Sequence, residues 1–455
     1  MTTGRSARVF GRAARTFAVI FVAAMLVPAW LLAHPRLTRS EPAAGARLDA
    51  SPVEIRLWFS ERVEISLSRI WVLDSAGVAM EVGSVASDSA PTIHVPVLRT
   101  LARGRYTVTW RTAGVDGHPL EGKFGFTVDL SDSASAPGTD AAADTVSVET
   151  RAFSATSAAY VAVRALLYAA LLGTIGAIVF LVGILPRVHD LSAAALAGIH
   201  AHVGRIGAWA AWVLLIAVIG RLVLQSMVVN GPRAFEHLPL VHLTMHTQWG
   251  KAWMTQLAGA LLAFPALRGL ARGHRISMVL GVVAVIVLSV APALGGHAAA
   301  VKQFSWLAMG ADAVHVVSAA GWLGSLLYLT MAALPVLARE SGERRWHTAA
   351  AMVHAFSPVA LLLGGLVVIT GATNAVFQLG SPQALWTSGY GRVLSIKLAL
   401  FVLLLAVATY NWRRLRRAMG GESATERLAR SARRELALGF LVIVATALLV
   451  AMPTP

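Results

Sequence analysis

Apolar and polar residues alternate in short runs between residues 34 and 130. Three clear runs lie at 53–59, 106–110 and 124–128. In the first of them Val53, Ile55, Leu57 and Phe59 would share one face of an extended strand. Period-two alternation broken by glycine and proline is typical of short, half-buried strands. It predicts a β-sandwich (Ig-like, Greek-key) over residues 34–130.

The rest of the chain carries apolar runs of about 20 residues, the length that a helix needs to cross a bilayer. About eight such runs occur, at 157–185, 204–229, 250–270, 276–294, 304–334, 354–377, 391–412 and 434–452. They predict an all-α polytopic membrane domain of about eight transmembrane helices over residues 157–455. The stretch 131–156 is rich in Ser, Ala, Asp and Thr, and we interpret it as a flexible linker.

Residues 1–33 have the layout of a secretory signal peptide. Four arginines precede an apolar run from Phe17 to Leu32, and the small residue Ala33 comes next. Leu31 stands where a small residue is preferred, so an uncleaved anchor is the alternative. Cleavage after Ala33 would make His34 the first residue of the exported domain.

Composition excludes an ordinary soluble protein, because 56% of the 455 residues are hydrophobic and only 14% are charged. The net charge of +16 suggests a nucleic-acid partner at first sight. The arginines, however, gather in alternate loops between the predicted spans, with eight of them in 413–434. The positive-inside rule then places the sandwich outside a bacterial cytoplasmic membrane, with the C-terminus outside as well. The basic charge therefore indicates topology, and the expected partners include a lipid bilayer and no nucleic acid.

Metal chemistry enters through three residues of the predicted exported domain. The chain has no cysteine, so a soft or borderline metal must be held by His, Met and carboxylate. The amine and imidazole of His34, with Asp116 and His118, would give the nitrogen-rich square site that Cu(II) prefers. Pro35 has no N–H and cannot contribute a backbone amide ligand. The alternative is an ordinary Asp-Gly turn beside a solvated histidine; His94 and Met80 are spare ligand candidates.

A second group of candidates falls in the predicted membrane domain. His297 ends the fourth span on the outer side, and Asp312 and His315 come after it in the fifth. His315 would lie roughly 16 Å from the start of that span, near the bilayer centre. Ionisable residues at that depth are costly and usually face a pathway or a partner. The alternative is a helix-holding pair, with Asp312 joined to His315 or to an arginine.

The predicted outer loop between the second and third spans holds a third group. It reads His237-Leu-Pro-Leu-Val-His-Leu-Thr-Met-His246. His242, Met245 and His246 could pass copper from the sandwich to the membrane helices. Idle loop residues are an equally good interpretation of this segment.

Two stretches resemble known copper proteins. The run His34-Pro-Arg-Leu-Thr-Arg-Ser-Glu-Pro-Ala-Ala-Gly45, with Asp116-Gly-His118-Pro, resembles the CopC periplasmic copper-binding domain. The motifs Gly296-His297-Ala, Trp322-Leu-Gly324 and Tyr390-Gly-Arg392 resemble the CopD copper-resistance membrane family. The first resemblance implies a β-sandwich in which His34, Asp116 and His118 bind Cu(II). A fusion of both modules resembles copper import proteins of the CopCD type.

These observations predict a non-enzymatic protein of copper homeostasis that captures copper outside and transports it inward. Copper is the expected metal; its donor outside the membrane and its acceptor in the cytoplasm are not identified by the sequence. The alternatives are resistance by sequestration without transport, a copper oxidase, and a haem or copper membrane oxidoreductase. Haem ligands must pair at one depth, whereas His297 and His315 are predicted at different depths.

Overall fold

The computed structural model describes residues 37–60, 62–88, 91–114, 117, 119–129, 157–230, 234–296, 298, 305–379, 381–415 and 422–452. The chain divides into two compact units, which are described separately. The helical unit contains Ala155–Leu224 and Ala252–Pro455, and the sandwich unit contains Ala33–Ser154 and Gln225–Lys251. The predicted signal peptide and the predicted linker lie outside the described residues.

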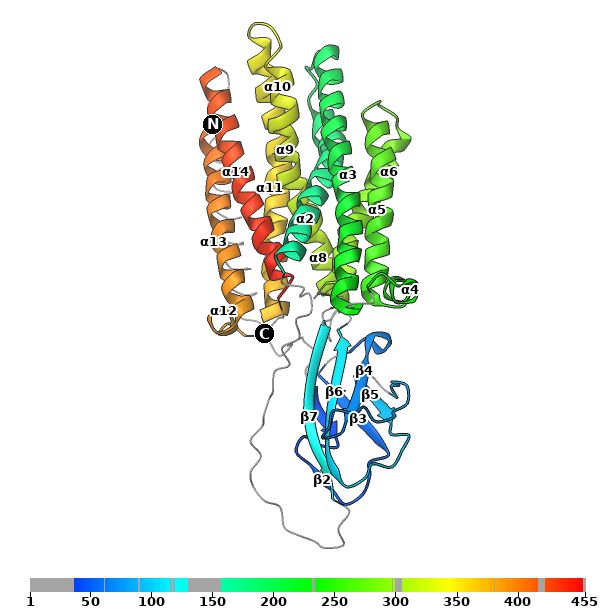
Figure 1. Cartoon of the computed structure of the whole chain (residues 1–455). Helices are drawn as coiled ribbons and strands as arrows, with labels where there is room; N and C mark the ends of the chain where they lie inside the picture. Colours follow the sequence, from blue (N-terminus) through cyan, green and yellow to red (C-terminus); the bar gives the residue numbers. More distant parts are fainter. Residues whose placement is uncertain are drawn as a thin grey trace. The chain divides into compact units, whose positions relative to one another are not determined.

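The sandwich unit is built on two sheets (Figure 1). One sheet has the order β1-β3-β5 and the other β2-β7-β6-β4. The strands are β1 (Leu37–Glu41), β2 (Arg47–Leu48), β3 (Glu54–Phe59), β4 (Arg69–Leu73), β5 (Thr92–Pro96), β6 (Gly104–Ala113) and β7 (Pro119–Val128). All neighbours pair antiparallel except β2 and β7, which are parallel. The predicted β-sheet domain is thus confirmed.

The alternating residues of β3 fill the space between the sheets. Ile55 and Leu57 are fully buried, and the ring of Phe59 meets Trp110 edge to face with centroids 5.2 Å apart. The alternation predicts Val53 on the same face, but β3 begins one residue later and Val53 is 85% exposed. The pattern therefore locates the core correctly and misplaces only the start of the strand.

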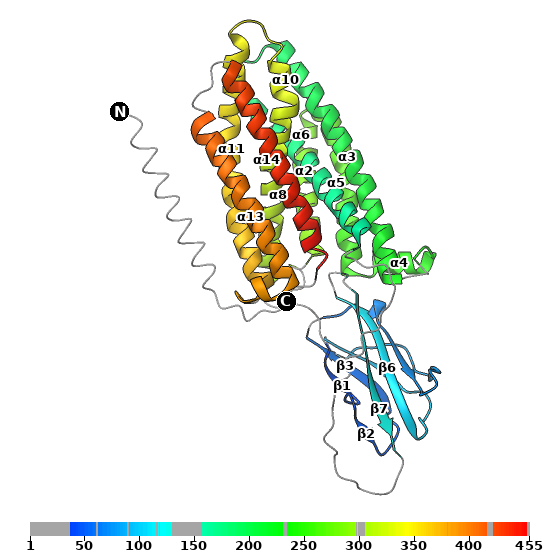
Figure 2. The same cartoon turned by 60° about the vertical axis from the view of Figure 1, so that its left-hand side comes forward.

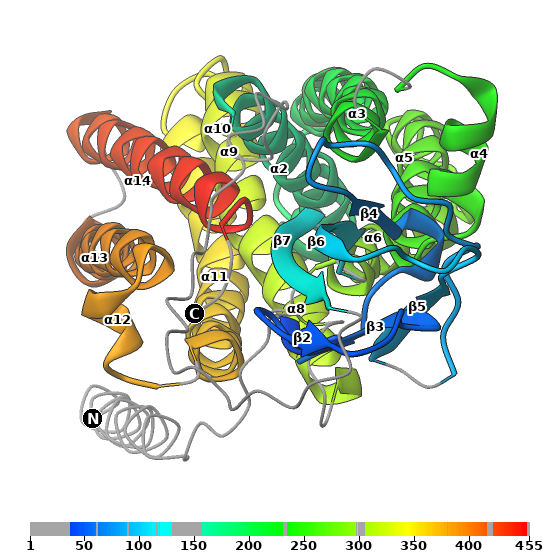
Figure 3. The same ribbon diagram turned by 60° about the horizontal axis from the view of Figure 1, so that its bottom comes forward.

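The helical unit is an assembly of long helices (Figure 2). In the part of the chain that the structure describes, the α-helices are α2 (Ala158–Val179), α3 (Ala193–Asn230), α4 (His237–Met245), α5 (Gln248–Leu270), α6 (Ile276–Leu294), α8 (Ser305–Ala319), α9 (Ser325–Tyr328), α10 (Leu334–Leu337), α11 (Arg344–Leu379), α12 (Ala384–Thr387), α13 (Gly389–Tyr410) and α14 (Glu422–Leu449). Helix α8 packs against α6 and α11, and α13 packs against α14 (Figure 3).

Among the described residues, six helices are long and apolar enough to cross a membrane. They cover Ala158–Arg187, Ala193–Asn230, Ile276–Leu294, Ser305–Leu337, Arg344–Leu379 and Gly389–Arg413. The two other predicted spans form α5 and α14. Polar residues such as Gln256 lower the apolarity of α5, and the first half of α14 is charged. A helical membrane domain is confirmed, and the expected count of eight is not.

The span Ser305–Leu337 changes its helical geometry twice. A π-helical turn at Ala320–Gly324 succeeds α8, and a second one precedes α10. The first turn packs on α2 with almost no space between the backbones, since a β-carbon added at Gly176 would lie 2.4 Å from Gly324 Cα. Tyr328 further donates a hydrogen bond to the carbonyl of Gly173 at 2.8 Å. These contacts fix the helix that carries His315 against α2.

The segment predicted as an outer loop is partly helical. Residues 237–245 form α4, whose buried Leu243 faces inward. Thr244 and Thr247 each donate a hydrogen bond to the carbonyl four residues back, at 2.9 and 2.6 Å. Nine residues of helix place their side chains on a fixed surface, which an irregular loop would not do.

Candidate metal sites

The predicted Cu(II) ligands His34, Asp116 and His118 lie outside the described residues, so this site stays a prediction. The structure describes Gly117, which stands between two of them in the connection from β6 to β7. Its N–H donates to the carbonyl of Gly114 at 2.9 Å, which closes a tight turn. Its φ of +81° is in the left-handed region that glycine adopts without strain.

This turn is held by the segment 225–251 of the same unit. Gln225, which is almost fully buried, donates from Nε2 to the carbonyl of Gly117 at 2.8 Å. A β-carbon at Gly117 would lie 2.8 Å from Cδ1 of the buried Trp249, so the glycine packs directly on the indole. A residue with a side chain would be excluded by both contacts.

Two further hydrogen bonds join the segment to the sandwich. Arg111 donates to the carbonyl of Val228 at 2.7 Å, and the backbone N–H of Gln248 donates to Oε1 of Glu64 at 2.8 Å. Burial raises the pKa of Glu64, and the bond from Gln248 and the charge of Lys251 oppose that rise. The segment is thereby anchored to the sandwich at its two ends.

The candidates on α4 are brought together. His242 and Met245 lie on α4 and His246 is the residue that caps its C-terminal end. The two imidazole centroids are 5.0 Å apart. All three side chains are exposed. Partial burial lowers the pKa of His242, and the positive charges of His246 and Arg69 lower it further. The neutral imidazole, which is the form that binds metals, is therefore favoured at His242.

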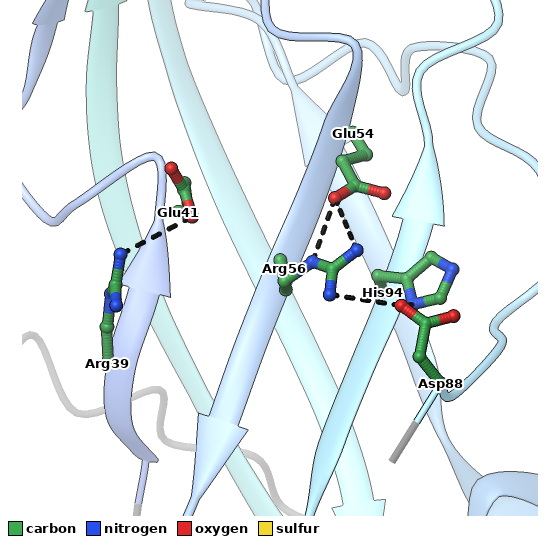
Figure 4. Close-up of polar contacts among 6 residues, drawn as sticks. All are labelled: Arg39, Glu41, Glu54, Arg56, Asp88 and His94. Atoms are coloured by element: carbon green, nitrogen blue, oxygen red, sulfur yellow. Dashed lines mark hydrogen bonds and ion pairs between the residues drawn. The ribbon is translucent and has the colours of Figure 1, made fainter.

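The spare candidates of the sandwich have other roles. His94 lies opposite Arg56 in the β3–β5 pair, with Nδ1 3.7 Å from Asp88 Oδ2 (Figure 4). Arg56 bridges two carboxylates, at 3.0 Å to Asp88 and 2.8 Å to Glu54. Met80 packs against the hydrophobic core. This part of the sheet is therefore an ion-pair network centred on Arg56.

The membrane candidates Asp312 and His315 meet helix α11. Asn374 Nδ2 donates to Asp312 Oδ1 at 3.1 Å, and His315 Nδ1 lies 3.0 Å from Thr370 Oγ1. The two side chains of α8 thus have neutral partners that lie one turn apart on α11. Lys397 of α13 is near enough to interact electrostatically with both Asp312 and His315. His297 lies outside the described residues and stays a prediction.

Glycine makes room for the imidazole. A β-carbon at Gly371 would lie 3.3 Å from Cε1 of His315, closer than most such contacts. Trp322 lies in the π-helical turn that follows α8 and packs edge-on to Phe401 with centroids 6.5 Å apart. The extra residue of a π turn rotates the next part of the helix about its axis, so positions beyond this turn do not continue the face of α8 that carries His315.

The arginines that could have paired with Asp312 have other contacts. The guanidinium of Arg164 lies 4.1 Å from the ring centroid of Tyr160, and Arg221 donates to Gln256 at 3.0 Å. The sequence reasoning missed Asn374 as a partner of Asp312. Two polar residues four positions apart in an apolar helix, Thr370 and Asn374, are the pattern that could have revealed it.

Within the described parts of the chain, no three His, Cys, Asp or Glu side chains lie close enough together to hold a metal ion. Among the described candidates, Asp312 and His315 lie one turn apart on α8, and the rings of His242 and His246 lie close together.

Comparisons with known proteins assign each region. The CopC domain model matches residues 37–129, a copper resistance protein D-like N-terminal domain matches 154–304, and copper resistance protein D matches 350–449. The copper transport protein CutJ of Bacillus subtilis (strain 168) is 25% identical over 97% of this chain and 78% of its own. Copper resistance protein C of Pseudomonas syringae pv. tomato is 34% identical over 25% of this chain and 94% of its own.

Among solved structures, CopC from Methylosinus trichosporium OB3b is 35% identical, covering 21% of this chain and 94% of its own, with a TM-score of 0.20. The chain thus combines a β-sandwich with a helical membrane domain. The chain belongs to the CopC family of copper resistance proteins, joined here to a CopD membrane domain. The resemblance to both families is confirmed.

Proposed function

We propose that this protein captures Cu(II) with its sandwich and carries copper across the cytoplasmic membrane into the cell. The observation that carries the proposal is the placement of Asp312 and His315 on one helix of the membrane domain, each with a neutral partner on α11. The relatives named for copper resistance and copper transport support the same cargo. No catalytic step is required.

The contacts of His315 favour one tautomer. The hydroxyl of Thr370 donates to the carbonyl of Leu366, so its oxygen is left to accept from Nδ1–H of His315. The proton then sits on Nδ1, and Nε2 carries the lone pair. Metal-binding histidines are commonly oriented by such a bond on the other ring nitrogen. Nε2 of His315 would therefore be the atom that binds copper.

Asp312 would attract the cation before it reaches the imidazole. The bond from Asn374 orients the carboxylate without neutralising it, because an amide carries no charge. Lys397 balances that charge when no copper is bound. A cation entering this region would exchange the ammonium for itself as the neighbour of Asp312, which limits the cost of charge in the membrane. His297 would load the path at its outer end.

Capture would take place at the amine and imidazole of His34 with Asp116 and His118, after cleavage behind Ala33. This arrangement requires the sandwich and the C-terminus outside the cytoplasmic membrane. The copper donor outside and the acceptor inside are not specified by the described residues.

The test is cellular copper accumulation, normalised to the folded protein in the membrane. We expect His315→Ala to abolish uptake and to leave Cu(II) binding by the sandwich intact, and Asp312→Asn to give a partial loss. His354→Ala is the matched control, because it removes an exposed imidazole from α11 and should not change uptake. His118→Ala should instead weaken Cu(II) binding by orders of magnitude.

Normal normalised uptake by His315→Ala would contradict the pathway. Wild-type cells that hold no more intracellular copper than cells lacking the protein would indicate sequestration instead of import.

A further inference from the structure

We propose that α4 carries a second copper site, selective for Cu(I), in which His242, Met245 and His246 are the ligands. The proposal rests on the proposed function in taking copper as the cargo. It concerns binding alone: no transfer of an electron or of copper between sites is implied.

The donor set is presented on one helical face. Positions 242, 245 and 246 are related by three and four residues, the spacing that brings side chains together on an α-helix. The imidazole centroids are 5.0 Å apart with the rings tilted by 33°. All three donors are uncharged, which disfavours Mg(II) and Ca(II), and the soft thioether favours Cu(I) over Zn(II), which imidazole alone would also bind.

The exposure of these residues has no packing explanation. Met245 is 56% exposed although its side chain is apolar, whereas Leu243, two positions earlier, is fully buried. The opposite face of α4 is thus the one that holds the helix in place. Thr247 caps the next helix by accepting from the N–H of Gly250 at 2.9 Å, which defines where α4 stops and α5 starts. The donors are therefore accessible on a helix that is itself fixed.

The grooves beside the two histidines carry charges of both signs. His246 borders a groove of about 490 Å³ that also contains Arg62, Glu64 and Asp88. His242 borders a second groove, of about 410 Å³, together with Ser66 and Arg69. The charge of the grooves therefore does not select the ligand, and the proposal rests on the donor atoms and their spacing.

The position of α4 relates it to the Cu(II) candidates. Gln225 and Trp249, on either side of α4 in the chain, both contact Gly117 between Asp116 and His118. The sandwich unit would therefore hold one site for each oxidation state, with different donors. No amine or carboxylate is needed at α4, and no methionine at the N-terminal site.

The test uses the full-length protein in detergent, titrated anaerobically with Cu(I) against a chromogenic Cu(I) chelator. We expect the triple variant His242→Ala/Met245→Leu/His246→Ala to bind one Cu(I) fewer than the wild type. Each single histidine variant should bind that ion at least about tenfold more weakly, the loss seen when even an indirect partner of a metal ligand is removed. A sulfur neighbour in the copper X-ray absorption spectrum should disappear in Met245→Leu.

His237→Ala is the matched control, because it removes an exposed histidine from the first turn of the same helix. Its Cu(I) stoichiometry should equal that of the wild type. Unchanged Cu(II) binding by the triple variant verifies that the sandwich is folded. Equal Cu(I) stoichiometry and affinity in the triple variant and the wild type would overturn the site.

The outcome separates this site from the transport proposal. Loss of one Cu(I) from the triple variant, in a protein that does not raise cellular copper, would support the site and contradict import. Normal copper uptake by the wild type, together with unchanged Cu(I) binding in the triple variant, would support import and contradict the α4 site.

Discussion

The sheet β1-β3-β5 and the helix pair α8–α11 both carry acidic and imidazole side chains, yet they satisfy them differently. On the sheet, Arg56 bridges Glu54 and Asp88, and His94 stands beside them. Between the helices, Asp312 and His315 are bonded to an amide and a hydroxyl. The hydrogen-bond partners are thus charged groups on the sheet and neutral groups between the helices, where Lys397 interacts with Asp312 electrostatically.

The difference has an energetic basis. An exposed ion pair contributes little, typically below about 1 kcal/mol, because water solvates the separated charges almost as well. A polar group inside the membrane domain has no water to replace a lost partner, so the loss of that partner leaves its hydrogen-bonding atoms unsatisfied. The two clusters should therefore respond very differently when one partner is deleted.

The largest effect is expected for Asn374→Leu. It removes the donor to Asp312 and leaves a carboxylate oxygen unpaired, which should lower the stability of the membrane domain by about 1–3 kcal/mol. The triple variant Asp312→Leu/Asn374→Leu/Lys397→Met removes the carboxylate, its hydrogen-bond donor and the ammonium that faces it, and should recover much of that loss. Thermal unfolding of the detergent-solubilised protein, monitored by size-exclusion chromatography, measures both variants. A triple variant less stable than Asn374→Leu would show that these polar groups do not act as a unit.

A smaller effect is expected at Glu64, where burial raises the pKa of the carboxyl. The folded pKa lies above the unfolded value, so this group stabilises the fold at low pH, and the contribution is lost as pH rises through the folded pKa. Glu64→Gln keeps the acceptor for the N–H of Gln248 without the charge. At neutral pH the free energy of unfolding of Glu64→Gln should match or exceed that of the wild type, and the difference between the two proteins should shrink as the pH falls.

Hydrogen exchange of the Gln248 amide, compared between the variants and the wild type at equal pH, measures these differences in stability. Glu64→Ala removes the acceptor and should speed exchange by about fivefold or more, equivalent to about 1 kcal/mol. Exchange that is equally fast in Glu64→Gln and Glu64→Ala would contradict a role for the hydrogen bond.

The smallest effect is expected for Arg56→Ala. Its two ion pairs are partly exposed, so exchange in β3 and β5 should change by the equivalent of less than about 1 kcal/mol, and by less still at high salt. A loss as large as that of Asn374→Leu would remove the contrast between the two clusters.

Patterns local in the sequence predicted the sheet and the apolar helices, because alternation and apolar length report burial directly. They also predicted that Asp312 and His315 share a helix. The same patterns did not identify hydrogen-bond partners that lie on other helices or strands. Asn374 is 62 residues from Asp312, and Gln225 is 108 residues from Gly117, so only the tertiary fold brings them together. The exact number of membrane spans is not confirmed, because polar residues lower the apolarity of α5 and charged residues fill the first half of α14.

The hydrogen bond from Gln225 to Gly117 couples two parts of the sandwich unit thermodynamically. A ligand that bound the β6–β7 connection only while this hydrogen bond is formed would also stabilise the contact of residues 225–251 with the sandwich. By reciprocity, the same free energy returns as tighter binding whenever that segment is ordered first. Copper bound beside Gly117 would then slow hydrogen exchange in α4 without contacting that helix. Metal occupancy at the β6–β7 connection could therefore be measured through the hydrogen exchange of residues 225–251.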